Sequence, residues 1–470
     1  MTSNMRFTIR VALTVALGGF LMGFDASVIS GVVSFIEPQF ELTKFELGWA
    51  VASLTLTATL AMMISGPLSD RFGRRPVLKV AALLFAASAV ASAVAPDYIT
   101  LVIARMLGGF GVGAALIIAP MYIAEIAPPA VRGRMVSFNQ LNIVIGISAA
   151  YFSNYLILSL GQSDLAWAQT LMLSEWSWRW MLGVEALPAV FYFLALFFVP
   201  ESPRWLVMQN KDEDALEVME QVSGREQAEA ELHEVRQSLV AEADLEKASF
   251  RELFHPTMKL VLTIGIAIAI LQQITGINSV FFYAPMIFEQ SGIGTDAAFM
   301  QAVLVGVVNL VFTVLAIMLI DKIGRRPLLG VGLTVIAVCM LLLAYGFGSA
   351  TYSPSGELIE MNASLILIGI LGFVAGFAIS LGPVMWVLFS ELFPNRVRGI
   401  AISFVGLINS AVSFGVQLVF PWELENFGPS TTFLIYGLFA IAGLVFVMRI
   451  LPETKGRSLE QLEAELVFRK

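Results

Sequence analysis

Charged residues are scarce in this chain of 470 residues. They make up 14% of it, whereas hydrophobic residues make up 57% and the mean hydropathy is +0.81. A soluble globular chain usually carries about 25% charged residues. The shortage excludes a surface that faces mainly water, and the length suits about a dozen membrane spans of roughly 20 residues with their loops.

Cysteine and histidine are nearly absent as well. Cys339 is the single cysteine, which excludes an internal disulfide, and the two histidines have no cysteine or histidine near metal-ligand spacing. We therefore expect no metal site, no cofactor and no enzyme activity, because neither a Ser-His-Asp nor a Cys-His arrangement is available. The sequence also lacks a basic patch, so nucleic-acid binding is not expected.

What the chain has instead is a series of segments with no more than one charged residue each. A β-barrel would show shorter segments of alternating polarity, so we expect helices, which pair their own backbone groups in lipid. The segments are Val11–Ser34, Leu47–Leu68, Pro76–Ala95, Tyr98–Ala124, Met135–Leu160, Trp180–Val199, Leu260–Phe288, Ala297–Ile320, Pro327–Ala350, Met361–Ser390, Gly399–Trp422 and Gly428–Val447. The first is too long for a cleaved signal peptide, and we expect it to be retained.

Lysine and arginine gather in every second connection, which sets the orientation in the membrane. With a cytoplasmic N-terminus, the outside connections hold only Lys44 and Arg179. The inside connections hold Arg71, Arg74, Arg75, Arg132, Arg134, Lys322, Arg325, Arg326, Arg396 and Arg398. The bias predicts a multi-pass protein of the cell inner membrane with both termini in the cytoplasm.

One long acidic loop divides the spans into two sets of six. From Lys211 to Glu252 it holds 13 acidic and 5 basic residues. Its apolar pattern, and the pair Ser202-Pro203 at a helix start, predict short amphipathic helices. We expect an N-terminal bundle at 1–200, a cytoplasmic helical linker at 201–256, a C-terminal bundle at 257–451 and a cytoplasmic tail at 452–470.

Short motifs repeat between the two halves. Asp70-Arg-Phe-Gly-Arg-Arg75 returns as Asp321-Lys-Ile-Gly-Arg-Arg326, after the second span of each half. A glutamate ahead of Val-Arg-Gly occurs at Glu125 and again at Glu391. Two six-helix halves in parallel repeat are a known transporter plan with a site near the bilayer midplane. We therefore expect an all-α membrane protein whose twelve transmembrane helices form two six-helix pseudo-repeats.

Together the motifs resemble those of the sugar porters of the major facilitator superfamily. Besides the repeated motif they are Pro200-Glu-Ser-Pro-Arg-Trp-Leu206, Gln272-Gln-Ile-Thr-Gly-Ile-Asn278, Gly382-Pro383 with Trp386, and Pro452-Glu-Thr-Lys-Gly456. The resemblance runs from about Val11 to Leu459. It implies the major facilitator fold and a sugar symporter of the proton-coupled bacterial type.

Neutral carboxamides lie within the apolar spans. They supply the donors and acceptors that sugar hydroxyls need, since a hydroxyl buried unpaired costs roughly 1–3 kcal/mol. Taken alone, each amide is explained as readily by contacts between helices. The resemblance implies a sugar-binding set of Gln140, Gln272, Gln273, Asn278, Asn309, Trp386 and Asn409.

Two positions near this set depart from the family pattern. Ser410 stands where tryptophan is common, and Met22 stands where phenylalanine is common. Both are expected to reshape the pocket. The sequence therefore leaves hexose, pentose and cyclic polyol open.

Asp25 and Arg105 are the only charged residues in the first and fourth spans. A buried charge in a membrane is costly and usually marks an ion path or a paired partner. A structural salt bridge is one interpretation. The resemblance implies a proton-coupling pair, in which Asp25 accepts the proton and Arg105 tunes it. Glu185, alone in the sixth span, is expected to be a packing or surface-facing acid.

Two gates are expected. Thr275-Gly276 offers a break in span seven, and beyond it Phe282 and Tyr283 are candidates for an extracellular gate. Topology alone explains the arginines of the inner loops but not the glutamates at helix ends. The resemblance implies a cytoplasmic gate made of Arg74, Glu125, Arg132, Glu201, Arg325, Glu391, Arg398 and Glu453.

These observations favour a secondary transporter that imports a monosaccharide by proton symport. The partners are the sugar, the proton and the lipid bilayer, and the repeat plan needs only one chain, so we expect a functional monomer. An uncoupled facilitative sugar or polyol carrier and an inositol/proton symporter remain alternatives. A carrier of organic acids is disfavoured because the amide set is uncharged.

Overall fold

The computed structural model describes residues 3–128, 131–244, 249–356, 358–457 and 459–466. Within these ranges twelve helical segments are long and apolar enough to cross a membrane. They are Asn4–Gly31, Lys44–Phe72, Arg74–Ala93, Tyr98–Ile126, Arg132–Gly161, Ser177–Phe198, Pro256–Glu289, Thr295–Ile323, Arg325–Gly348, Ala363–Leu392, Arg398–Asn426 and Gly428–Ile450. Each overlaps one of the expected apolar segments.

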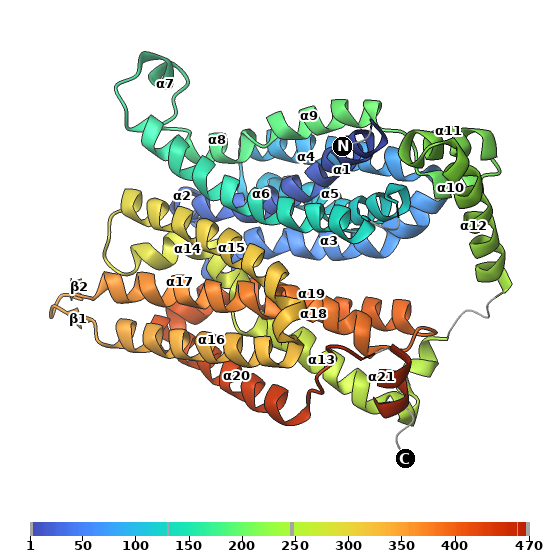
Figure 1. The fold of residues 1–470 in the computed structure, drawn as a ribbon. Helices are drawn as coiled ribbons and strands as arrows, with labels where there is room; N and C mark the ends of the chain where they lie inside the picture. The colour runs from blue at the N-terminus through green and yellow to red at the C-terminus, as the bar shows by residue number, and fades with distance from the viewer. Residues whose placement is uncertain (1–2, 129–130, 245–248, 357, 458, 467–470) are drawn as a thin grey trace. The chain divides into compact units, whose positions relative to one another are not determined.

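The chain divides into two compact units (Figure 1). Unit 1 contains Met1–Val28, Ser53–Ala150 and Asp164–Lys247, and unit 2 contains Ile29–Ala52, Tyr151–Ser163 and Ala248–Lys470. The second unit thus includes one end of the first, second and fifth spans. The bundle boundaries expected from the sequence stay a prediction.

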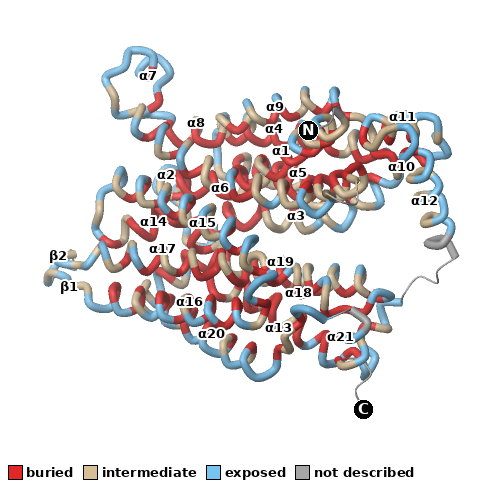
Figure 2. The backbone as a smooth tube through the Cα atoms, in the orientation of Figure 1, coloured by how far each residue is buried: buried red, intermediate tan, exposed pale blue. Residues whose placement is uncertain are grey.

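Unit 1 holds the first six spans, apart from those ends, and the linker helices. Tight packing follows from small residues: a Cβ on Gly23 of α1 would lie 2.0 Å from the Ile143 carbonyl oxygen of α6, and one on Gly146 would lie 2.1 Å from that of Phe20. Buried residues concentrate along α5 (Figure 2). The elements are α1 (Ser3–Val28), α3 (Lys44–Phe72), α4 (Arg74–Ala93), α5 (Tyr98–Ile126), α6 (Arg132–Gly161), α7 (Ala166–Thr170), α8 (Ser177–Gly183), α9 (Ala186–Ala195) and the 3-10 helix η2 (Leu196–Phe198).

Three linker helices follow, as expected: α10 (Pro203–Met208), α11 (Asp212–Ser223) and α12 (Arg225–Asp244). The expected helix start is confirmed, because the Ser202 side chain accepts a hydrogen bond from the Trp205 N–H and Pro203 occupies the first turn. One face of α11 is buried. The linker therefore packs on unit 1 through an amphipathic face.

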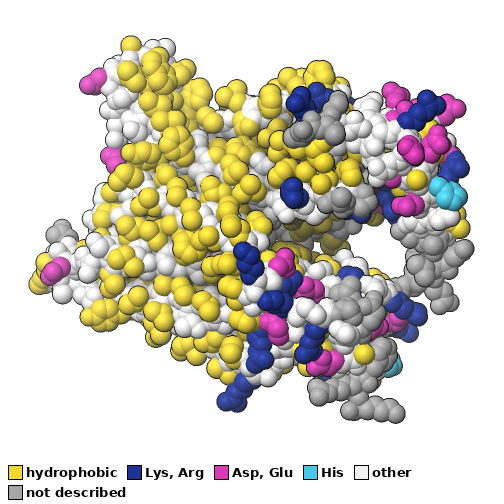
Figure 3. Space-filling view, viewed as in Figure 1, with side chains coloured by type: hydrophobic (Ala, Val, Ile, Leu, Met, Phe, Trp, Pro, Cys, Tyr) yellow, Lys and Arg dark blue, Asp and Glu magenta, His cyan; other side chains and the backbone are white. Residues whose placement is uncertain are grey.

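Unit 2 holds the remaining spans and two interruptions. Its elements are η1 (Ile29–Gly31), α2 (Val33–Gln39), η3 (Phe250–Phe254), η4 (Pro256–Met258), α13 (Lys259–Ile274), α14 (Ile277–Glu289), α15 (Thr295–Ile323), α16 (Arg325–Gly348), β1 (Thr351–Tyr352), β2 (Leu358–Glu360), α17 (Ala363–Ile379), α18 (Leu381–Leu392), α19 (Arg398–Asn426), α20 (Gly428–Ile450) and α21 (Leu459–Leu466). On the visible face of this unit, hydrophobic side chains cover α15 to α17 and charged ones gather near α21 (Figure 3).

The interruption in span seven is confirmed. Gly276 separates α13 from α14 in a left-handed conformation, with φ at 90°. Only glycine adopts this conformation without strain. A second interruption, between α17 and α18 at Ser380, and the small antiparallel pair of β1 and β2 were not expected from the sequence.

Candidate functional site

The carboxamides around the Gly276 break form one network in unit 2. Gln273 donates to Gln272 Oε1 at 3.1 Å and to Asn409 Oδ1 at 3.4 Å, and Asn409 donates to Gln272 Oε1 at 2.8 Å. Asn278 donates to Gln273 Oε1 at 2.8 Å and to Ser413 Oγ at 2.7 Å. The break between α13 and α14 brings Gln273 and Asn278 together, as the sequence predicts.

These side chains point into unit 2. Gln272, Gln273 and Asn409 are buried and Asn278 is partly buried. The network is uncharged, and every amide in it offers both a donor and an acceptor. It can exchange its internal hydrogen bonds for bonds to a neutral polyhydroxyl ligand without leaving a buried polar group unpaired.

The other members of the expected set lie in different settings. Asn309 is buried on α15, and Trp386 on α18 is 49% exposed, with its ring edge-to-face against Phe389. A half-exposed indole ring can stack on an apolar surface. Gln140 lies on α6 in unit 1, where it is exposed.

Two polar residues of this site, Ser413 and Gln417, were not predicted from the sequence. Ser413 accepts from Asn278, and Gln417 donates to Ser413 Oγ at 2.8 Å. Asn409, Ser413 and Gln417 are spaced four residues apart in α19. That spacing places them on one helix face, and it was visible in the sequence.

Asp25 and Arg105 pair in the interior of unit 1. Both are buried, at 1% and 2% exposure, and Arg105 Nη1 donates to Asp25 Oδ1. Arg105 Nη2 also donates to the main-chain carbonyl oxygen of Asp25, at 3.0 Å. Asp25 Oδ2 has no hydrogen-bond partner among the described residues. One carboxylate oxygen is therefore left for a further ligand such as a proton.

Glu185 belongs to the same charged group. It lies between α8 and α9, is 2% exposed, and interacts electrostatically with Asp25 and Arg105. The surface-facing interpretation is therefore wrong. Within the part of the chain that the structure describes, Glu185 Oε1 has no hydrogen-bond partner. Two carboxyls and one guanidinium thus share a buried region of unit 1.

A charged cluster joins α3, α4, α5 and the linker in unit 1. Arg74 is buried, and its guanidinium bonds Asp70 at 2.7 Å and Glu125 at 2.8 Å. Glu201 accepts from the backbone N–H groups of Arg74 and Arg75, at 3.1 and 3.2 Å. Partial burial raises the pKa of Glu201, and these backbone hydrogen bonds oppose the rise.

Unit 2 repeats the cluster. Arg325 bonds Glu391 at 2.7 Å and Asp321 at 3.1 Å, and Glu453 accepts from the backbone N–H groups of Arg325 and Arg326 at 3.1 and 3.0 Å. Each set therefore pairs within its own unit. The two remaining arginines of the expected gate make other contacts. Arg132 is exposed, lines a small pocket together with Glu125 and interacts electrostatically with Glu231, and Arg398 donates to the Phe393 carbonyl oxygen.

The residues expected at the extracellular gate lie in α14. Phe282 and Tyr283 are buried, and the Tyr283 hydroxyl donates to the main-chain carbonyl oxygen of Gln417 at 3.0 Å. Tyr283 also departs from helical geometry, with φ −128° and ψ 15°. The helix is therefore bent at the expected gate.

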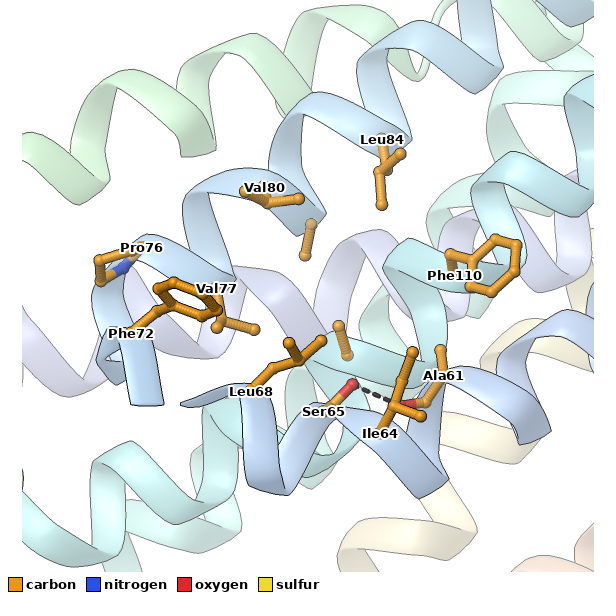
Figure 4. Close-up of a pocket in the computed structure, with 12 residues that line it drawn as sticks. Ala61, Ile64, Ser65, Leu68, Phe72, Pro76, Val77, Val80, Leu84 and Phe110 are labelled. Atoms are coloured by element: carbon orange, nitrogen blue, oxygen red, sulfur yellow. Dashed lines mark hydrogen bonds between the residues drawn. The ribbon is translucent and has the colours of Figure 1, made fainter. Parts of the chain in front are cut away.

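A separate pocket of about 430 Å³ lies in unit 1 between α3, α4 and α5 (Figure 4). Its lining is apolar apart from Ser65, whose hydroxyl donates to the Ala61 carbonyl oxygen at 2.5 Å. It offers no donor set for a sugar. We therefore place the candidate site at the amide network and not here.

Known proteins resemble this chain over nearly its whole length. A family described as sugar (and other) transporters matches residues 11–466. The arabinose-proton symporter of Bacillus subtilis (strain 168) is 39% identical over 461 residues, which cover 98% of this chain and 95% of the relative. The D-xylose-proton symporter of Escherichia coli (strain K12) is 37% identical over an alignment of 494 residues, which covers 98% of this chain and 96% of that relative.

A solved structure agrees. The inward open conformation of the xylose transporter XylE from E. coli matches with a TM-score of 0.82 and 35% identity, over 98% of this chain and 100% of that one. The expected fold class, a major facilitator fold with twelve membrane-spanning helices, is confirmed. The chain is a multi-pass membrane transporter and not an enzyme, and it belongs to the sugar (and other) transporter family.

Proposed function

We propose that this protein imports a monosaccharide, a pentose or a hexose, by proton symport through alternating access. The observation that carries the proposal is the buried, uncharged amide network of Gln272, Gln273, Asn278 and Asn409. Relatives named as arabinose-proton and xylose-proton symporters support the same substrate class.

The sugar exchanges hydrogen bonds with this network. Its hydroxyls replace the bonds that Gln273 makes to its neighbours, so the site stays satisfied when empty and when filled. Asn309, Trp386 and Gln140 complete the proposed binding set. The half-exposed ring of Trp386 covers the apolar face of the sugar.

Asp25 carries the proton in this proposal. In the ionised form it is held by Arg105. Protonation of the carboxyl weakens that pair, and transport couples to the proton if the two forms favour different conformations. Glu185 adds a second buried carboxyl to the same region.

The remaining assignments are part of the same proposal. The clusters around Arg74 and Arg325, with Arg132 and Arg398, form the cytoplasmic gate, and Phe282 with Tyr283 forms the extracellular gate. Two six-helix bundles, at 1–200 and 257–451, carry out the alternating access. The protein acts as a monomer in the cell inner membrane, with both termini in the cytoplasm and no nucleic-acid partner.

Two alternatives have different signatures. An uncoupled facilitator needs no acid in the first span. The presence of the buried Asp25 in that span therefore argues against an uncoupled facilitator. An inositol/proton symporter uses the same amide chemistry, since a cyclic polyol presents the same hydroxyl groups as a sugar.

Purified protein in liposomes tests these choices. Pentoses, hexoses and inositol are added one at a time while internal pH and sugar content are recorded. Acidification that accompanies uptake of a pentose or hexose is expected. Uptake without acidification supports the facilitator, acidification with inositol alone supports the polyol carrier, and uptake of none of them contradicts the proposal.

A further inference from the structure

Three helices of unit 2 contain a proline in their interior: Pro38 lies near the end of the short helix α2, Pro285 lies in α14 and Pro421 lies in α19. Proline has no backbone N–H, so the carbonyl four residues earlier loses its helical hydrogen bond. In α14 and α19 the carbonyls affected are those of Phe281 and Gln417.

A tyrosine hydroxyl meets each of these carbonyls. Tyr151, in the C-terminal third of α6, donates to the Phe281 oxygen at 2.5 Å, and Tyr283 of α14 donates to the Gln417 oxygen at 3.0 Å. Both tyrosines are buried, at 1% and 0% exposure. Packing explains why the rings are buried, but not why the two hydroxyls meet the carbonyls that Pro285 and Pro421 release.

The two contacts form a series across three helices. The first joins α6 to α14, and the second joins α14 to α19. Between them α14 bends at Tyr283, as expected where a proline removes a helical hydrogen bond. A buried carbonyl without a donor is costly in a membrane, so each contact favours the bent form of α14.

We propose that Tyr151 and Tyr283 are positioning residues that supply the two hydrogen bonds Pro285 and Pro421 remove, and so hold α14 bent between α6 and α19. When α14 moves away from either neighbour, a carbonyl is left without its donor. The two hydroxyls therefore set how readily α14 opens. This inference rests on the proposed function only where it treats α14 as a gate.

The series also reaches the candidate sugar site. Gln417, whose carbonyl accepts from Tyr283, donates from its side chain to Ser413 Oγ, and Ser413 accepts from Asn278. Asn278 is in the first turn of α14, on the other side of the bend. A ligand that replaces the bond between Asn278 and Ser413 thus acts on the helix that the tyrosines hold.

Hydrogen–deuterium exchange of residues 277–289 tests the proposal without any sugar. Tyr151→Phe removes only the hydroxyl and is expected to speed exchange in α14 by about fivefold, the population shift that corresponds to one net hydrogen bond. In a Pro285→Ala background the restored N–H pairs the Phe281 carbonyl. There the same substitution is expected to change exchange by less than about twofold.

A second experiment of the same design combines Tyr283→Phe with Pro421→Ala, and hydrogen–deuterium exchange is followed in residues 277–289 and in α19. Tyr192→Phe is the matched control, because this buried tyrosine donates to the Val15 carbonyl of α1 and should leave α14 unchanged. If each tyrosine substitution has the same effect with and without its proline, or no effect in either background, the proposal is wrong. Because no transport is measured, that result is distinct from failure of the proposed function.

Discussion

Arg105 holds Asp25 at two places, through the carboxylate oxygen Oδ1 and through the main-chain carbonyl of the same residue. The second bond survives protonation of the carboxylate, whereas the first is weakened by it. The guanidinium therefore has a partner in both protonation states. This arrangement lowers the cost of a charge change at a site with almost no exposure.

Asp25→Asn should separate coupling from movement of the sugar. The amide retains an oxygen that accepts from Arg105, so the fold is expected to persist, but the titratable group is lost. Proton-driven accumulation in liposomes should fall to simple equilibration, while exchange of labelled for unlabelled sugar continues. Accumulation equal to the wild-type level would rule out a coupling role for Asp25.

Gly108→Ala should disturb the same pair by sterics alone. A Cβ at this position would lie 2.6 Å from Asp25 Oδ2 and 2.6 Å from Ser88 Oγ. We expect a loss of about 1–3 kcal/mol in the free energy of unfolding and weaker coupling. Gly66→Ala is the control, since no described atom lies within 4 Å of its added Cβ. Equal thermal stability of the two variants would contradict the packing argument.

Gln273→Ala should weaken sugar binding. It removes the residue that links Gln272, Asn409 and Asn278, and it leaves ligand hydroxyls without partners. The KM for the transported sugar is expected to rise roughly tenfold or more, since each lost bond costs about 1–3 kcal/mol. Gln169→Ala, on an exposed face of α7, should leave the KM unchanged. A Gln273 variant with wild-type KM would remove this residue from the binding set.

Gly276→Ala should impair both folding and transport. Its φ of 90° is strained for alanine by roughly 1–2 kcal/mol, and the added Cβ would lie 2.5 Å from the Tyr436 ring. Gly356 has φ at 85° but no described atom within 4 Å of its added Cβ, so Gly356→Ala isolates the backbone cost. Thermal unfolding should therefore show a larger loss at 276. Matching losses would mean that contact with Tyr436 costs nothing.

The pH dependence of stability should include a contribution from Glu201. Its pKa lies above the ordinary value of 4.5, so the folded state binds the proton more tightly than the unfolded state. Stability from this group is then highest at low pH and declines as pH rises from about 4.5 through the folded-state pKa. Glu201→Gln should flatten that decline. An unchanged slope of unfolding free energy against pH would refute the assignment.

Much of the architecture was predictable because lipid imposes a simple rule. A span must be apolar and helical, so twelve charge-poor segments sufficed to predict twelve spans. The break at Gly276 and the cap at Ser202 were predictable because each depends on local residue chemistry. The β1–β2 pair was not, since five residues carry too little pattern.

The site was predictable in part. The family resemblance identified Gln272, Gln273 and Asn278, but it gave no direction for their side chains, which the Gly276 break determines. Glu185 appeared isolated because its neighbours, Asp25 and Arg105, are far away in sequence. Contacts between residues that are distant in sequence depend on how the helices pack, and they produce no periodic pattern in a single amino-acid sequence.

The carboxylates of Glu201 and Glu453 each accept a hydrogen bond from the backbone N–H of the residue that follows a glycine with positive φ. These glycines are Gly73, with φ at 103°, and Gly324, with φ at 105°. A Cβ on Gly73 would lie 2.4 Å from Glu201, and one on Gly324 would lie 2.8 Å from Glu453. The same glycine–glutamate contact therefore occurs twice in one chain, at Gly73 with Glu201 and at Gly324 with Glu453. The same substitution can be made at either contact, and any difference between the two variants in transport reports what each half does in the transport cycle.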